Sequence, residues 1–216
     1  RDWSSDVCSS DLKRLELQPA GLAISNKDLH KVPDGFKCSE IFEEACILSD
    51  GRVVCSCADS MAQYVLGDVH NCNIYDIFNN IHFQRIRHAL MSNKSPGLCM
   101  ECPLRNKNFN STDSLIMPRI TVLQIEVINA CNLKCPECIM SCATRRGANG
   151  SYMSFETFKD VIDQLAGPLE MIKFYNYGEP FLHKESIRML EYIKKIDPKI
   201  SIYISTNGTC ISEDKQ

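Results

Sequence analysis

Three cysteines in the run CNLKCPEC constrain what this chain can fold into more than any other feature. Cys131, Cys135 and Cys138 have the spacing C-x3-C-x2-C. Three thiolates in one short loop can hold three irons of a [4Fe–4S] cluster and leave the fourth iron open to a small molecule. A zinc loop or a ferredoxin-like electron carrier uses similar spacings. The segments that flank the loop must therefore distinguish a cluster with an open iron from a zinc loop or an electron carrier.

The residues around this loop alternate between strand and helix patterns. An apolar run directly precedes it and is typical of a strand covered on both faces. Ser154 is placed to cap a following helix, and Pro198 ends the next one. The expected elements are strands at 120–128, 171–175 and 199–205 and helices at 155–165 and 187–196. This alternation predicts an α/β fold with a parallel sheet and right-handed crossovers.

Two further motifs follow the second and third expected strands. YGEP occupies residues 177–180 and STNGT occupies residues 205–209. In parallel α/β folds, active sites collect at the carboxyl ends of the strands. The cysteine loop and these two motifs all have that position, so we expect them to form one composite site.

Together these motifs resemble the radical S-adenosylmethionine (SAM) superfamily. The resemblance implies a partial (β/α) barrel, of which residues 119–216 would supply about three βα units. Since the family commonly has six units, we expect a fragment of a longer protein. The resemblance also implies that Cys131, Cys135 and Cys138 bind a [4Fe–4S] cluster whose open iron chelates SAM.

The resemblance assigns the other motifs to SAM. Gly178, Glu179 and Pro180 stand where the family has a GGEP-type motif lining the methionine end of SAM, and Ser205, Thr206 and Asn207 would make polar contacts nearby. Two positions depart from the family pattern. Tyr177 replaces the usual first glycine of the motif, and Glu137 replaces an aromatic residue that often contacts adenine.

The implied reaction is reductive cleavage of SAM to a 5′-deoxyadenosyl radical, which activates a C–H bond of a peptide or small metabolite. A peptide is the favoured substrate class, and flavodoxin or ferredoxin would be the reducing partner. The alternative is a non-catalytic iron–sulfur electron carrier or a zinc-binding scaffold. Neither alternative explains the motifs at the ends of two later strands.

A separate cysteine pattern occupies the front of the chain. Asp50–Gly51 predicts a hairpin, and residues 74–91 have one apolar helical face. The region resembles a SPASM or twitch-type auxiliary iron–sulfur domain, a small cysteine-rich α+β unit that usually follows the barrel. The expected ligands are Cys38, Cys57, Cys99 and Cys102, with Cys55 competing with Cys57. A structural zinc site with the same thiolates is the alternative.

The composition indicates which binding partners and which cellular compartment to expect. Thirteen cysteines among 216 residues, in metal-type spacings, favour iron–sulfur ligation in a reducing cytoplasm over disulfides. A net charge of −3 gives no reason to expect nucleic acid, and no apolar run is long enough to predict a membrane span.

The sequence divides into four parts. Residues 1–12 match the translation of a common sequencing adapter, with a genuine polar leader as the alternative. Residues 13–105 form the expected auxiliary domain, residues 106–118 a polar linker and residues 119–216 the barrel portion.

Overall fold

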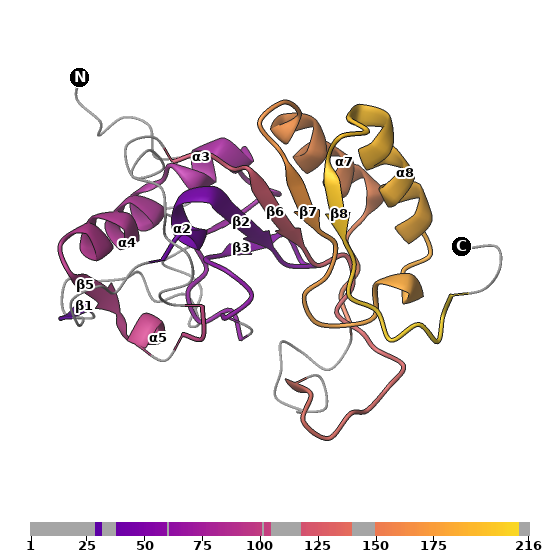
Figure 1. Ribbon diagram of the computed structural model, residues 1–216, viewed down its shortest axis with the longest axis horizontal. Helices are drawn as coiled ribbons and strands as arrows, with labels where there is room; N and C mark the ends of the chain where they lie inside the picture. The colour runs from indigo at the N-terminus through magenta and orange to yellow at the C-terminus, as the bar shows by residue number, and fades with distance from the viewer. Residues whose placement is uncertain are drawn as a thin grey trace.

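The computed structural model describes residues 29–31, 38–59, 61–100, 102–104, 118–139 and 150–211. One six-stranded sheet runs through the molecule (Figure 1) in the order β4-β3-β2-β6-β7-β8. Its strands are β2 (Glu44–Ile47), β3 (Arg52–Val54), β4 (Gly67–Asp68), β6 (Val122–Ile125), β7 (Met171–Lys173) and β8 (Ser201–Tyr203). From β2 through β6 and β7 to β8 the pairing is parallel, whereas β3 and β4 add antiparallel strands at the front.

The cysteine-rich front region and the α/β region meet within this sheet. Ala45 of β2 lies beside Leu123 of β6, and both side chains are fully buried. Buried residues from both regions form one hydrophobic cluster. The two regions therefore share a core instead of meeting only across a linker.

Two helices pack on one side of β6, β7 and β8. These are α7 (Phe155–Leu165) and α8 (Ser186–Ile196), and Figure 1 shows them side by side beyond β7 and β8. Ser154 caps α7 because its hydroxyl accepts a hydrogen bond of 3.0 Å from the Thr157 amide. Phe158 of α7 meets Phe174 edge to face, with ring centroids 6.2 Å apart. The expected strand–helix alternation and parallel sheet are thus confirmed.

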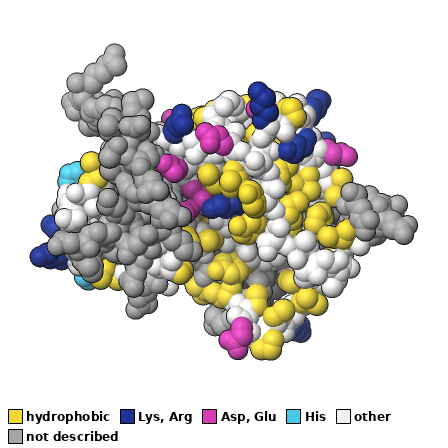
Figure 2. Space-filling model, in the orientation of Figure 1, with side chains coloured by type: hydrophobic (Ala, Val, Ile, Leu, Met, Phe, Trp, Pro, Cys, Tyr) yellow, Lys and Arg dark blue, Asp and Glu magenta, His cyan; other side chains and the backbone are white. Residues whose placement is uncertain are grey.

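The other face of these strands is more polar. Because paired residues of parallel strands project to the same side, Gln124 and Lys173 share a face, and Cys46 of β2 belongs to it. On the surface seen in Figure 2, charged side chains lie among hydrophobic ones over the described part of β6 to β8.

The front region adds short helices beside β2. They are α2 (Glu40–Glu43), α3 (Ile74–Phe78), α4 (Ile81–Met91) and α5 (Gly97–Met100), and β1 (Leu29–Lys31) pairs with β5 (Lys94–Pro96) in a separate two-stranded sheet. The single amphipathic stretch expected at 74–91 is two helices. The Asn80 side chain accepts from the amides of His82 and Phe83 at 2.9 and 3.1 Å, which starts α4 and leaves Ile81 41% exposed.

The hairpin predicted at Asp50–Gly51 joins β2 and β3. Gly51 has φ of +86°, a conformation that glycine adopts without strain, and its amide donates to the Leu48 carbonyl at 2.9 Å. The strands of the α/β region are shorter than predicted. The run at 120–128, for example, pairs as a strand only over Val122–Ile125, because the chain then turns so that Ile128 bridges Tyr152.

Two predictions concern residues outside the described ranges, namely those for the adapter-like segment and for most of the linker. No helix among the described residues combines the length and apolar character needed to cross a membrane.

Candidate functional site

The three predicted motifs come together at one edge of the sheet. The cysteine loop follows β6, the YGEP loop follows β7, and residues 205–209 follow β8. Hydrogen bonds described below join each of these loops to the other two. The structure therefore assembles the composite site that the positions of the motifs predict.

Gly178 lets the YGEP loop approach the chain that leaves β6. It has φ of +109°, and a Cβ atom added there would lie 2.5 Å from the Ile128 carbonyl oxygen. Next to it, the Glu179 amide donates to the Ala130 carbonyl at 2.8 Å. Since Ala130 precedes the first cysteine of the loop, this contact fixes where the cysteine loop begins.

Glu179 joins the YGEP loop to the loop after β8. The residue is 1% exposed, and its carboxylate accepts from the Thr206 hydroxyl and the Asn207 amide, both at 2.7 Å. It also accepts from the Phe181 amide at 3.0 Å and so caps the short 3-10 helix η4 (Pro180–Leu182). Both carboxylate oxygens are therefore bonded within the protein.

Hydrogen bonds from asparagine side chains connect the Cys131 segment to the loop after β8. Its sulfur accepts from the Leu133 amide at 3.4 Å and from Asn207 Nδ2 at 3.7 Å. Asn207 Nδ2 also donates to Asn132 Oδ1 at 3.0 Å, and Asn132 Nδ2 donates to Thr209 Oγ1 at 2.7 Å. Donors aimed at a cysteine sulfur stabilise its anionic form, which is the form that binds iron.

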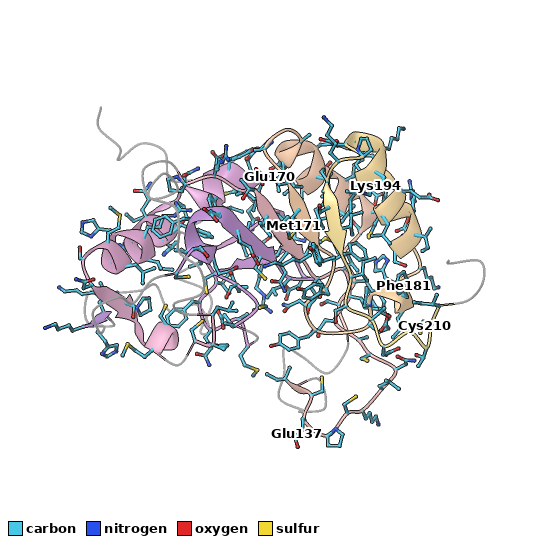
Figure 3. All side chains as sticks on the ribbon, viewed as in Figure 1. Glu137, Glu170, Met171, Phe181, Lys194 and Cys210 are labelled. Atoms are coloured by element: carbon cyan, nitrogen blue, oxygen red, sulfur yellow. The ribbon has the colours of Figure 1, made fainter. Side chains whose placement is uncertain are left out.

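The remaining loop cysteines lie nearer to solvent. Cys135 is exposed and Cys138 half-buried, and the Cys138 amide donates to the Cys135 carbonyl at 3.0 Å. Figure 3 shows Glu137 at the far tip of this loop, well away from Phe181 and Cys210. Among the described residues, no three cysteine, histidine, aspartate or glutamate side chains are arranged closely enough to hold a metal ion. The three thiols match an iron–sulfur cluster in donor type and in their position at the strand end, but they are not arranged closely enough to hold it in this structure.

Several cysteines of the front region influence one another's pKa values. Burial raises the pKa of Cys38 to about 11 and that of Cys99 to about 12, and Cys102 contributes to both shifts in the same direction. Burial likewise raises the pKa of Cys55, and so do Cys99 and Cys38. The pKa of Cys57 is influenced instead by Glu44, Lys173 and Gln124. Of the two competing residues, Cys55 is therefore the one that lies near Cys38 and Cys99.

A buried ion pair connects the front region to β7. The Lys173 ammonium contacts the Glu44 carboxylate, whose side chain is 4% exposed, and lies 3.8 Å from Glu40. Burial and the nearby Glu40 together raise the pKa of Glu44 to about 8, although Lys173 opposes both effects. This pair lies on the polar face of the sheet, beside Cys57.

The sequence does not reveal several of the contacts in this site. Asn132 and Thr209 lie inside the recognised motifs, but their pairing depends on the meeting of two loops that are far apart in sequence. Gln124 and Glu126 could have been found, because each interrupts an otherwise apolar run. A polar side chain in a buried strand needs a partner.

Comparison with known protein families identifies both regions. The model described as "Radical SAM superfamily" matches residues 125–215, and the model described as "Iron-sulfur cluster-binding domain", SPASM, matches residues 38–103. The chain therefore contains a match to each of these two models, and its SPASM domain precedes its radical SAM domain. The family implies a [4Fe–4S] cluster and SAM, and the SPASM domain implies auxiliary iron–sulfur binding.

Two known proteins resemble this chain over part of its length. The GTP 3′,8-cyclase of Geobacter sulfurreducens is 29% identical over 96 residues, which is 44% of this chain and 29% of the cyclase. The crystal structure of BtrN in complex with AdoMet and 2-DOIA has 27% identity and a TM-score of 0.38, covering 44% of this chain and 39% of BtrN. The chain thus spans less than half the length of either protein.

Proposed function

We propose that the chain forms part of an enzyme that holds a [4Fe–4S] cluster through Cys131, Cys135 and Cys138. The observation that carries this proposal is the hydrogen bond from Asn207 Nδ2 to the Cys131 sulfur, 3.7 Å long. It brings a donor from the loop after β8 to the first cysteine of the loop after β6. Such donors tune the potential of an iron–sulfur cluster.

The neighbouring loops would bind SAM. We assign Gly178, Glu179, Pro180, Ser205, Thr206 and Asn207 to the SAM-binding site, either as contacts or as residues that position it. Their roles differ: because the Glu179 carboxylate is bonded to Thr206 and Asn207, it would hold the loops in place instead of touching SAM. Ser205 and Asn207 are exposed beside the cysteine loop and would supply the polar contacts.

When bound, the cluster and SAM supply one-electron cleavage of the sulfonium and a radical that removes hydrogen from an unreactive C–H bond. The protein's own contribution would be to orient SAM and to keep water from the reacting atoms. A flavodoxin or ferredoxin would deliver the electron. We propose a peptide as the first substrate class to test, with small metabolites second.

In the SPASM domain we propose Cys38, Cys55, Cys99 and Cys102 as ligands of the auxiliary cluster. This assignment ranks Cys55 above Cys57 because Cys55 lies near Cys38 and Cys99, whereas Cys57 lies near Glu44 and Lys173. Buried thiols with raised pKa values stay protonated at neutral pH unless a metal displaces the proton. Iron or zinc could do so, and iron analysis after anaerobic purification distinguishes them.

The test is SAM cleavage by the anaerobically reconstituted protein. With dithionite as reductant, methionine and 5′-deoxyadenosine would be quantified by mass spectrometry. We expect both products from the wild type and from the control Cys72→Ala, and neither from the variant with Cys131, Cys135 and Cys138 all changed to Ala. If the wild type is reduced but leaves SAM intact, the electron-carrier function is favoured. Zinc in place of iron would favour the scaffold.

A further inference from the structure

A buried carboxylate connects the SPASM hairpin to the YGEP loop. Glu126 lies just after β6 and is 1% exposed. Its Oε2 accepts from the amide and the hydroxyl of Ser49, at 3.2 and 3.0 Å, in the turn that follows β2. Its Oε1 accepts from the Tyr177 amide at 3.2 Å. One side chain thus contacts the SPASM hairpin and the first residue of the YGEP motif.

Tyr177 supplies a second link between the same two regions. Its hydroxyl donates to the Cys57 carbonyl across 3.5 Å, a long hydrogen bond in the segment that also carries Cys55. A glycine in this position would retain the amide contact to Glu126 and lose the link to Cys57. The tyrosine side chain therefore ties the YGEP loop to the cysteine-bearing loop of the SPASM domain.

From Tyr177 the contacts continue to the cysteine loop. Gly178 lies against the backbone of Ile128, and the Glu179 amide bonds to Ala130, which precedes Cys131. A displacement of the Cys55–Cys57 segment would pass through Tyr177 to the backbone that begins the cysteine loop. Close packing makes such a shift costly to absorb locally.

We infer that Glu126 and Tyr177 are positioning residues that couple occupancy of the auxiliary site to SAM binding at the YGEP loop. This rests on the proposed function in two respects, namely that SAM binds at that loop and that the SPASM cysteines hold a metal centre. Neither side chain needs to touch SAM. Their effect is on the position of Gly178 and Glu179, and energetic coupling between two sites is measured by a double-mutant cycle.

The cycle measures the dissociation constant of SAM by anaerobic equilibrium dialysis. It compares wild type, Tyr177→Phe, Cys99→Ala/Cys102→Ala and the combined variant. We expect loss of the auxiliary ligands to weaken SAM binding by about fivefold or more. Tyr177→Phe alone should weaken it by about two- to tenfold, as for the loss of one hydrogen bond. If the two sites are coupled through Tyr177, the combined variant binds SAM no more weakly than the worse single variant.

Tyr152→Phe is the matched control, because Tyr152 is 61% exposed and its ring meets His183 instead of the SPASM domain. It should leave SAM affinity unchanged. If the increase in the SAM dissociation constant of the combined variant equals the product of the two separate increases, SAM binds but the two sites are not coupled through Tyr177. If the wild type does not bind SAM, the proposed function fails, and the coupling to SAM fails with it.

A second measurement needs neither cluster nor SAM. Amide hydrogen exchange of a peptide spanning residues 174–180 is compared in wild type, Ser49→Ala and Ser49→Thr. Ser49→Ala removes a donor to Glu126 and should speed exchange of this peptide about fivefold, by the loss of one hydrogen bond. Ser49→Thr restores the hydroxyl and should restore slow exchange. Equal exchange in all three proteins would show that Glu126 does not link the hairpin to the YGEP loop.

Discussion

The two groups of cysteines in this protein sit in opposite environments. Those of the SPASM domain, such as Cys38 and Cys99, are packed against the hydrophobic core, and burial raises their pKa values. Those of the radical SAM domain lie on an open edge of the sheet, where Cys135 is exposed and Cys131 accepts hydrogen bonds from Leu133 and Asn207. The first group is partly buried against apolar side chains, whereas the second is contacted by polar groups and includes an exposed cysteine.

This difference matches two tasks. A group of four thiolates fills the coordination of a metal centre and has no need of solvent or cofactor access. A group of three leaves one position open, and a loop on the surface gives SAM a route to it. The contrast predicts that the open edge depends on exact backbone contacts, whereas the SPASM domain depends on ordinary packing and capping.

The largest expected effect is at Gly178, on the open edge. Gly178→Ala places a Cβ atom 2.5 Å from the Ile128 carbonyl in a conformation that favours glycine. We expect a loss of more than about 3 kcal/mol in the free energy of unfolding, or loss of SAM binding if the loop yields. Gly208→Ala is the control, since its φ is +74° but no atom lies within 4 Å. It should cost only about 1 kcal/mol. If the two substitutions lower the free energy of urea unfolding equally, the close approach at Gly178 is not what makes that glycine necessary.

The next effect concerns the ion pair between the two regions. Lys173→Met leaves the buried Glu44 carboxyl group without its cation. At about pH 9, above the Glu44 pKa of about 8, that group is ionised, and we expect the free energy of unfolding to fall by about 2 kcal/mol. Arg119→Met removes a cation whose pair with Glu170 is 3.8 Å long and about 70% exposed on both sides. That variant should change stability by less than about 0.5 kcal/mol. Chemical denaturation of both proteins decides the point, and similar values would mean that Lys173 does not hold the regions together.

A smaller, pH-dependent effect is expected at His183, behind the open edge. Burial lowers its pKa below the ordinary 6.5, while Nδ1 accepts from the Glu185 amide at 3.1 Å and Nε2 contacts the Met153 carbonyl. The stability that neutral His183 contributes is complete above pH 6.5 and is lost as the pH falls through the lowered value. His183→Gln should flatten this part of the stability–pH profile, whereas the exposed His70→Gln should not. A profile unchanged by His183→Gln would contradict the assignment.

The last prediction compares one helix cap from each region. Asn80→Ala removes the cap of α4 and a side-chain bond of 2.6 Å to the Leu66 carbonyl, so we expect a loss of about 2 kcal/mol. Ser154→Ala removes only the cap of α7 and should cost about 1 kcal/mol. Thermal unfolding measures both. The reverse order would mean that the SPASM domain relies less on this cap than the contacts indicate.

Much of the α/β region could be predicted because its signals are local. Ser154 capping α7 and Pro198 following α8 are readable from single positions, and the alternation of apolar residues marks the strands. The meeting of the three motifs was predicted from a rule about strand ends, which needs no knowledge of side-chain packing.

What could not be predicted depends on contacts between distant residues. The pairing of β2 with β6 is a parallel pairing of segments separated by more than seventy residues, and no local pattern specifies it. The preference for Cys55 over Cys57 arises in the same way, because the chain bends at residues 55–57. An extended C-x-C segment would present both thiols on one side. Only packing at the bend decides which thiol lies near Cys38 and which lies near Lys173.

The most direct test of this account is an anaerobic EPR spectrum of the dithionite-reduced protein, recorded with and without SAM. It compares wild type, the variant with Cys131, Cys135 and Cys138 changed to Ala, and Cys99→Ala/Cys102→Ala. We predict that SAM changes the [4Fe–4S]⁺ signal of the wild type and of Cys99→Ala/Cys102→Ala, and leaves any signal of the triple variant unchanged. A SAM-dependent change in the triple variant, or a wild-type signal indifferent to SAM, would contradict the assignment of the open site to the loop after β6.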